Sequence, residues 1–464
     1  MLNRREMLSR AGAGFGTLGL AASLQQQFTS CAFAATSFGH MTHLAARAKR
    51  VIFLFMNGAP SHVDTFDPKP ELARHAGEQP TGKLYKRSKG AGYKPSPFRF
   101  RPHGESGVVM SELFPHMSKV ADELCVLRSM HTDVPNHEPG LLMMNCGNQQ
   151  PIRPCLGSWA SYGLGNENQN LPAFVTLCPG MPVVGPQLWS SSFLPGEHQA
   201  TRLDTRNMQV EKLIANLNHP QLSRPQQRKQ LDLLQAFNKR HAAQRQNDAE
   251  LESQIRAMEL AFSMQREAQE AFDVSREPDH VHKAYGDSVF GKGTLLARRL
   301  VERGVRFVQV YDVDKGKQPW DTHSDNDNRH RQLCSYSDQA SAALISDLKQ
   351  RGLLEDTLVI WGGEFGRTPY AQGKPGDKKK VGRDHHHTGF SMVLAGGGVK
   401  GGMMYGATDD FGMDAVEDRI HVHDLHATIL HLMGIDHEQL TYRFSGRDFR
   451  LTDVHGRVVH DVIA

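Results

Sequence analysis

The chain has 464 residues, of which 39% are hydrophobic and 22% are charged. This composition is ordinary for a globular protein and excludes a polytopic membrane protein, a collagen-like chain and a fully disordered chain. The net charge of +4 is too close to balance to indicate nucleic acid as a partner. Histidine is the unusual count, with 25 residues, and it is the commonest metal ligand.

The first 34 residues have the features of an export signal. Arg4 and Arg5 form a pair, and an uncharged run rich in Gly and Ala follows at residues 11–24. A basic start before a weakly apolar core is typical of a signal peptide, and the arginine pair indicates the twin-arginine route. We therefore expect a twin-arginine signal peptide at residues 1–34, the twin-arginine translocase as a partner, and a periplasmic or other extracytoplasmic location. Cleavage is expected near Ala34, with a lipid anchor at Cys31 as the alternative.

Short apolar runs recur along the rest of the chain, and each is typical of a strand buried on both faces. The pattern predicts strands at residues 51–56, 124–127, 174–177, 307–310, 358–361 and 392–395. Between and after them, the apolar spacing predicts helices at 292–303, 332–351 and 423–433. This alternation of strands and helices indicates parallel βαβ units. No run approaches the roughly 20 apolar residues that a membrane span needs.

Residues 205–275 differ from this pattern. They are rich in Gln, Arg, Glu, Leu and Ala, and their apolar residues recur at helical spacing. We expect two or three helices inserted into the α/β domain as a solvated cap rather than as a coiled-coil surface. The predicted organisation is a signal peptide at 1–34 and one α/β domain at 45–464, with the insertion at about 205–275.

Carboxylates and imidazoles follow or flank several of the predicted strands. Ligands of parallel α/β sheets bind at the carboxyl ends of strands, so these residues are expected to meet at one edge. The residues concerned are Asn57, His62 and Asp64 after the first run, His131, Asp133 and His137 after the second, Asp321 and His323 after the run at 307–310, Glu364 and Arg367 after the run at 358–361, and His385 to His387 before the run at 392–395. Mixed Asp and His ligands suit zinc, manganese or iron better than calcium.

Several motifs occur in a characteristic order. They are Asn57-Gly, Asn136-His-Glu-Pro-Gly, Trp320-Asp-Thr-His, Gly363-Glu-Phe-Gly-Arg-Thr-Pro, Gly382-Arg-Asp-His-His and Tyr442-Arg-Phe-Ser-Gly-Arg. With the twin-arginine start, this order resembles an uncharacterised family of exported bacterial proteins related to sulfatases, within the alkaline phosphatase-like superfamily. The resemblance extends from about residue 45 to the end. It implies a mostly parallel sheet flanked by helices, with metal at the carboxyl edge.

The resemblance implies roles for individual residues. Asp321 and His323 match an Asp and a His that bind one metal, and His385 or His386 would complete that site. Glu364 and Phe365 stand where an Asp and a His bind a second metal, which leaves Glu364 as a ligand or as a residue that orients one.

Two further positions depart from the superfamily pattern. Asn57 replaces the metal-binding Asp at the end of the first strand. His137 occupies the nucleophile position, where sulfatases carry Cys, and it is expected to act as nucleophile, general acid or extra ligand. Asn57, Asn136 and Arg367 are expected to contact the substrate.

Two functions remain open on this basis. The first is a metal-dependent hydrolase that acts on a small-molecule or polysaccharide ester of phosphate or sulfate. It would use one or two divalent transition metal ions, zinc or manganese above others. The second is a catalytically degenerate binding or scaffold protein of the same fold. Ordinary formylglycine sulfatase chemistry is disfavoured because position 137 holds neither Cys nor Ser.

The export signal makes a direct prediction. Replacing Arg4 and Arg5 together with Lys should retain the protein in the cytoplasm, because the translocase recognises the two guanidinium groups and not positive charge alone. Cell fractionation followed by immunoblotting measures the distribution. Normal export of the double variant would refute the signal assignment.

Overall fold

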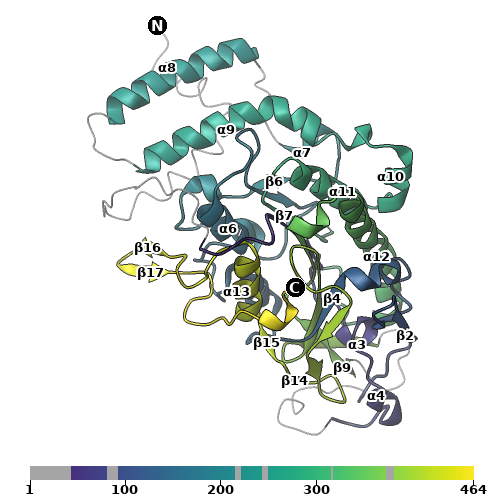
Figure 1. Cartoon of the computed structure of the whole chain (residues 1–464). Coiled ribbons are helices and arrows are strands. Elements are labelled where there is room, and N and C mark those ends of the chain that lie inside the picture. Colours follow the sequence, from purple (N-terminus) through teal and green to yellow (C-terminus); the bar gives the residue numbers. More distant parts are fainter. Residues whose placement is uncertain (1–42, 81–91, 215–220, 243–248, 315–316, 373–380) are drawn as a thin grey trace.

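The computed structural model describes residues 43–80, 92–214, 221–242, 249–314, 317–372 and 381–464 (Figure 1). The predicted signal peptide, including Cys31, lies outside the described residues. Among the helices of the described ranges, none is long and apolar enough to cross a membrane.

A nine-stranded sheet forms the centre of the molecule. Strand β11 pairs antiparallel with both of its neighbours, and every other pairing in this sheet is parallel. The mainly parallel α/β architecture predicted from the sequence is therefore confirmed. The strands in spatial order are β12 (Met403–Tyr405), β4 (Leu124–His131), β11 (Phe390–Ala395), β8 (Thr357–Gly362), β1 (Arg50–Phe55), β7 (Phe307–Tyr311), β5 (Phe174–Leu177) and β6 (Thr201–Leu203), with β15 (Ile420–His421) paired to β4.

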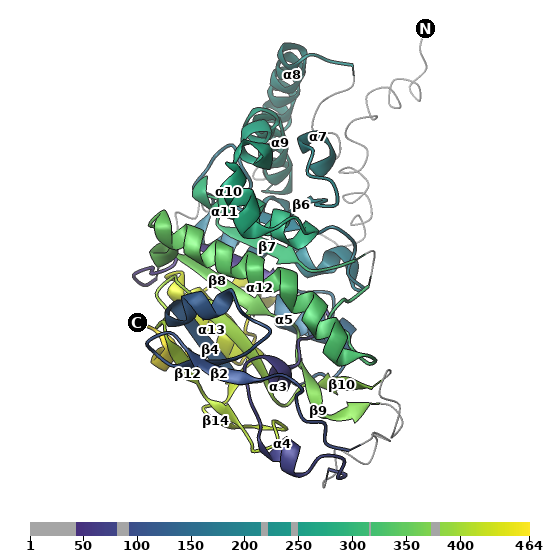
Figure 2. The same ribbon diagram turned by 90° about the vertical axis from the view of Figure 1, so that its right-hand side faces the viewer.

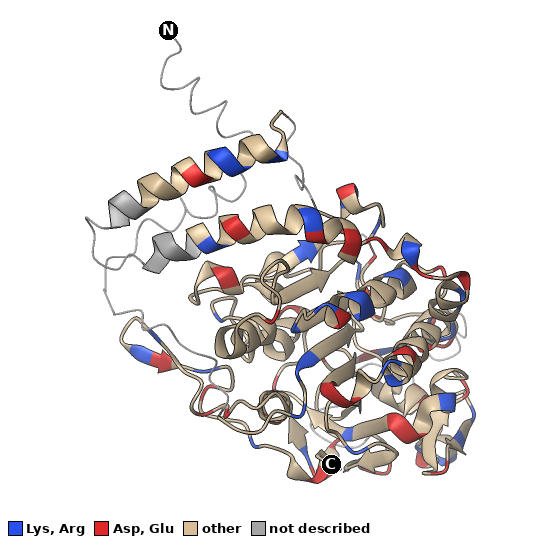
Figure 3. Cartoon of the chain, turned by 45° about the horizontal axis from the view of Figure 1, so that its top comes forward, with Lys and Arg blue, Asp and Glu red and all other residues tan. Residues whose placement is uncertain are grey.

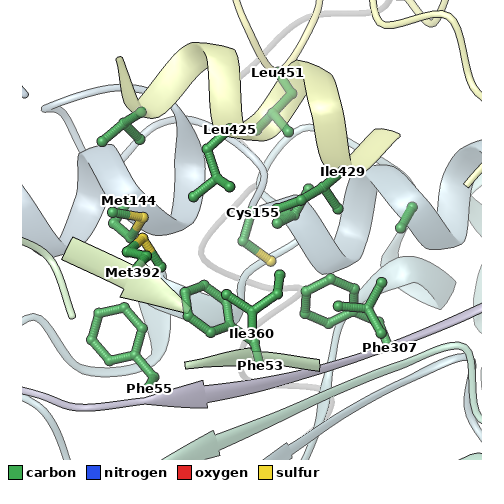
Figure 4. Close-up of a cluster of buried hydrophobic side chains, with 14 of the residues drawn as sticks. Phe53, Phe55, Met144, Cys155, Phe307, Ile360, Met392, Leu425, Ile429 and Leu451 are labelled. Atoms are coloured by element: carbon green, nitrogen blue, oxygen red, sulfur yellow. The ribbon is translucent and has the colours of Figure 1, made fainter. Parts of the chain in front are cut away.

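The central strands are mainly apolar because helices cover both faces of the sheet. Side chains alternate between faces along a strand, so Phe53 and Phe55 of β1 belong to one buried cluster while Ile52 and Leu54 belong to another. Figure 4 shows the first cluster, in which Phe53 and Phe55 lie beneath Leu425 of an overlying helix.

Two groups of helices cover the sheet (Figures 1 and 2). The cluster with Phe53 is closed by α5 (His137–Cys146), α6 (Leu156–Leu164) and α13 (Val422–Leu432). The cluster with Ile52 is closed by α11 (Val289–Glu302) and α12 (Asn326–Gln350). Helices α11, α12 and α13 correspond to the three helices predicted from the apolar spacing.

Smaller elements surround this core. They are the helices α3 (His62–Thr65), α4 (Glu71–Arg74) and α10 (Asp279–Tyr285), and the hairpins β2 (Phe100–His103) with β3 (Val108–Ser111), β9 (Gly366–Gln372) with β10 (Gly382–His386), β13 (Ala407–Thr408) with β14 (Ala415–Glu417), and β16 (Tyr442–Phe444) with β17 (Arg447–Phe449).

The region 205–275 contains α7 (Val210–Leu213), α8 (Arg224–Ala242) and α9 (Ala249–Ala271). One face of helix α8 is solvated: Leu233 and Phe237 are 59% and 61% exposed, although Leu231 is buried. Figure 3 shows both signs of charge along α8 and α9. The end of α9 differs, because Ala268, Ala271 and the following Phe272 are fully buried in the core beside the sheet. A solvated cap therefore describes α8 but not the end of α9.

This difference predicts unequal effects for two phenylalanine substitutions. Phe272→Ala should lower the free energy of unfolding by roughly 3–5 kcal/mol, because it leaves a cavity in the core. The matched change Phe237→Ala should stay within about 0.5 kcal/mol, because Phe237 is exposed on α8. Chemical denaturation of the two variants measures both values. Equal effects would contradict the packing of α9 into the core.

Candidate metal centre

The sheet topology gathers the predicted site residues at one edge. Strands β8, β1 and β7 are parallel neighbours, so the segments that follow them begin side by side. Strand β4 runs in the same direction and leads to α5, which begins at His137. Strand β11 runs the opposite way, so the segment before it, which includes His385, lies at the same edge. The antiparallel strand β11 thereby brings the histidine run to the same edge as the other predicted site residues.

Four side chains converge at this edge. One nitrogen or oxygen from each of His137, Asp321, His323 and His385 lies within 4.8 Å of every other. Asp321 Oδ1 is 3.2, 2.9 and 3.5 Å from the Nε2 atoms of the three histidines, in chain order. Within the described parts of the chain, this is the one group of three or more His, Cys, Asp or Glu residues with spacing suited to a metal ion.

Each of the three imidazoles has an oxygen acceptor at its Nδ1 atom. His137 Nδ1 is 2.6 Å from a carboxylate oxygen of Glu364 and His385 Nδ1 is 2.9 Å from the carbonyl oxygen of Pro135. His323 Nδ1 bonds the side-chain oxygen of Gln372. A neutral imidazole that donates from Nδ1 keeps a lone pair on Nε2, so in that tautomer each of the three rings can bind a metal through Nε2. Acceptors placed in this way orient histidine ligands in metalloproteins.

The four ligand atoms are suited to a bound cation in addition to the Arg367 guanidinium. The Nε2 atoms of His323 and His385 are 2.9 Å apart, so their lone pairs repel if both rings are neutral. Asp321 Oδ1 is buried and has no hydrogen-bond partner of acceptable geometry despite its close nitrogens. A metal ion bound by these four atoms satisfies all of them. Three nitrogen donors and one carboxylate fit zinc, manganese or iron.

The charges around Asp321 are unusually concentrated. Burial raises the pKa of this carboxyl, but the three imidazoles and the Arg367 guanidinium outweigh burial and hold the pKa well below its usual range. Burial also lowers the pKa of His137, yet its contacts with Asp321 and Glu364 raise that pKa to about 8. The site therefore favours positive charge beside an ionised Asp321.

Glu364 orients His137. Its side chain is fully buried, and its two carboxylate oxygens accept the Gly58 N–H at 3.1 and 3.2 Å. One of them also accepts from His137 Nδ1, on the ring side opposite the metal position. Glu364 is therefore not among the four clustered ligand atoms, and its contact with His137 is of the kind that orients a ligand.

His386 lies outside the cluster, contrary to its prediction as a ligand. Its Nε2 bonds the carbonyl oxygen of Met413, and its ring stacks on His62 with centroids 5.8 Å apart. Neighbouring residues of a strand point to opposite sides, so β10 presents either His385 or His386 to the site, but not both. His385 is the one presented.

The three predicted substrate contacts lie in different environments. Arg367 is fully buried; it donates from Nε to Ala59 O at 3.1 Å and from Nη2 to Gly58 O, and Nη2 is 2.7 Å from Asp321 Oδ1. Its Nη1 atom is buried and has no partner. Asn57 is fully buried, and both polar atoms of its side chain lack partners. Asn136 is exposed at the start of α5, where its side chain makes no capping bond.

Three functional contacts were not predicted from the sequence. Gln372 and the Pro135 carbonyl were missed as acceptors for His323 and His385, because only the folded β9–β10 hairpin and the loop before α5 bring them close. Phe365 was noted only as a replacement, whereas its ring packs against both His137 and His385, with centroids 5.0 and 5.2 Å away. The sequence did offer a signal for Phe365, because it is an aromatic residue directly after the predicted ligand Glu364.

The fold and the site define a mainly parallel α/β protein with a candidate metal centre at the carboxyl edge of its sheet. The chain belongs to the family described as protein of unknown function (DUF1501), whose model matches residues 48–463. The predicted resemblance to an uncharacterised family is therefore confirmed. No curated protein matches the sequence.

Solved structures of several enzymes are similar to this chain. A sulfatase from Pseudoalteromonas sp. is 14% identical, with 84% of this chain and 69% of that chain covered and a TM-score of 0.34. A phosphonate monoester hydrolase from Silicibacter pomeroyi is 10% identical, with 90% and 76% covered and a TM-score of 0.35. An alkaline phosphatase from the Antarctic bacterium TAB5 is 11% identical, with 84% and 99% covered and a TM-score of 0.31.

Asp321 is the side chain common to all the contacts of the metal centre. Asp321→Ala should weaken zinc affinity by more than about 100-fold, above the range for loss of an outer-shell partner. Far-UV circular dichroism should change little, because Asp321 lies on a loop at the edge of the sheet. Equilibrium dialysis with elemental analysis measures bound zinc.

His386→Gln is the matched control, since glutamine retains a donor for Met413. It should bind zinc as the unaltered protein does. Loss of zinc in this variant, with retention in Asp321→Ala, would show that the metal centre lies elsewhere.

Proposed function

We propose that this protein is an exported, metal-dependent hydrolase of phosphate, sulfate or related esters, with a small-molecule or polysaccharide substrate. The observation that carries the proposal is the convergence of three imidazole nitrogens and the Asp321 carboxylate at one point, with buried Arg367 against the same carboxylate. A metal site beside a guanidinium suits a substrate whose reacting group is an oxyanion.

Several residues of the chain are suited to binding the oxyanion of the substrate. The proposed donors to a substrate oxygen are Arg367 Nη1 and the Asn57 side-chain nitrogen, which are buried and have no hydrogen-bond partner in the structure. Helix α5 begins at this edge, so its N-terminal dipole adds favourable potential for an anion. A bound divalent cation would supply Lewis acidity toward the ester and lower the pKa of coordinated water.

His137 is better suited to ligation than to nucleophilic attack. Its Nδ1 is held by Glu364, and its Nε2 lies 3.2 Å from Asp321 Oδ1, among the other ligand atoms. An attacking group must reach the substrate freely, whereas both nitrogens of this ring have fixed partners. We infer that water attacks the ester directly.

A binding or scaffold protein is the second candidate. It is favoured by the engagement of two Arg367 nitrogens with the carbonyls of Ala59 and Gly58, which leaves a single donor for an oxyanion. Such a protein would bind metal and an anionic polysaccharide without hydrolysing it.

The two candidates predict different outcomes for one experiment. Protein purified from its exported location should contain about one zinc, manganese or iron ion per chain and should hydrolyse aryl phosphates or aryl sulfates. Activity should disappear on dialysis against a chelator and return with metal. Metal-loaded protein that binds polysaccharide but hydrolyses neither class would favour the scaffold.

Asn57→Ala tests the proposed donor. It should lower kcat/KM by roughly 10- to 1,000-fold, in the range for loss of one oxyanion donor, while metal content stays unchanged. Steady-state kinetics on the most active aryl ester, with elemental analysis of the same sample, measure both. Unchanged kinetics would remove Asn57 from the substrate site.

A further inference from the structure

The motif from Trp320 to His323 contains two residues that the metal centre does not use. Asp321 and His323 turn toward the ligand cluster and remain partly exposed. Trp320 and Thr322, which alternate with them, are fully buried. The four residues therefore form a short segment with one face toward the metal position and the other in the protein interior.

Trp320 is fixed from several directions. Its indole N–H donates to Asp312 Oδ2 at 2.8 Å, and its backbone N–H donates to Asn57 O at 3.1 Å. Its ring meets Trp361 of β8 edge to face, with centroids 5.8 Å apart and an interplanar angle of 89°. It meets His330 of α12 in the same manner at 5.5 Å. These contacts attach the loop to the end of the sheet and to a covering helix.

Asp312 is a firm anchor for this indole. It is the residue after β7, and its backbone N–H donates to Phe55 O of β1 at 2.9 Å. Its Oδ2 atom also accepts the Tyr336 hydroxyl at 2.8 Å. The indole bond therefore holds Trp320 against the residue that follows β7.

The ligand Asp321 directly follows Trp320 in the sequence. A Cβ at Gly58 would clash with the backbone nitrogen of Asp321, which shows how closely the two segments pack. Because the Asp321 carboxylate must stay within about half an ångström of its position for tight metal binding, whatever fixes its backbone contributes to affinity. Without the indole bond, Trp320 and Asp321 would have to be positioned when the metal binds, at a cost in affinity.

We propose that Trp320 is a positioning residue that sets the metal affinity of the site through Asp321, by way of the indole bond to Asp312. The proposal rests on the metal binding assumed in the proposed function, but not on hydrolysis. It assigns the four residues of the motif as two ligands alternating with two buried residues, of which Trp320 is the anchor.

The neighbouring tryptophan supplies a matched control. Trp361 is also buried in this cluster, but its indole nitrogen has no hydrogen-bond partner. Trp320→Phe and Trp361→Phe therefore remove the same atoms from the same cluster, and only the first breaks a hydrogen bond. The comparison separates the anchor from the general cost of a smaller ring.

The experiment measures the zinc dissociation constant of each variant by competition with a chromophoric chelator. Thermal unfolding of the metal-free proteins is measured alongside. Trp320→Phe should weaken zinc binding by roughly 10- to 100-fold, as for other residues that support ligands from behind. Trp361→Phe should bind zinc within about twofold of the unaltered protein, because removing an unpaired buried donor costs no hydrogen bond.

Substitutions of Asp312, the acceptor, test the same hydrogen bond. They also provide the test if Trp320→Phe does not fold. Asp312→Ala removes the acceptor and should weaken zinc binding as Trp320→Phe does. Asp312→Asn retains a side-chain oxygen that accepts the indole N–H and should restore most of the affinity.

Two other outcomes have distinct meanings. Equal zinc affinity in Trp320→Phe and Trp361→Phe, or in the two Asp312 variants, would overturn the role of Trp320. Failure of the unaltered protein to bind zinc, manganese or iron would overturn the metal centre itself, and with it the proposed function.

Discussion

The Asp321 carboxylate is the point on which the site depends. It is partly buried, where an isolated negative charge is costly, and the Arg367 guanidinium compensates it while three imidazole Nε2 atoms face it. Each of these groups comes from a different part of the chain: α5, the loop after β7, β9 and β10. These segments meet at the carboxylate of Asp321.

The polarity of the sheet decides which segments reach that charge. Parallel strands β8, β1 and β7 send their following loops to one edge, and the single reversed strand β11 lets the hairpin before it approach the same edge. Within the hairpin, the alternation of side chains selects His385 and turns His386 toward Met413. A one-residue shift in β10 would exchange the two histidines and dismantle the centre.

Support for the ligands extends well beyond the cluster. Helix α5, which begins with His137, is held at its other end by α13: His426 and His423 each place a ring nitrogen 2.8 and 2.9 Å from the carbonyl oxygens of Met144 and Gly147, respectively. These carbonyls end a helix and have no partner within it, so the two histidines satisfy them. Glu364 holds the first residue of the same helix, and the helix is thus fixed at both ends.

The amino-acid sequence by itself determined the class of fold and most members of the candidate site. Apolar runs of strand length predict β1, β5 and β8 because a strand covered on both faces must be apolar throughout. Asp321, His323 and His385 are recognisable because carboxylates and imidazoles at strand ends are exceptional in such a pattern. The sequence left the role of His137 among three alternatives and could not choose between His385 and His386.

The tertiary structure brings His385 rather than His386 into the cluster and supports the ligand role proposed for His137. The choice of His385 required the register of β9 against β10, and the role of His137 required Glu364 to meet its Nδ1 across 227 residues of chain. The acceptors Gln372 and Pro135 carry no local signal, since a side-chain amide and a peptide carbonyl occur everywhere in a sequence. Strand and helix patterns reflect burial of each residue against its near neighbours, whereas a metal centre depends on distances between side chains that only the assembled sheet brings together.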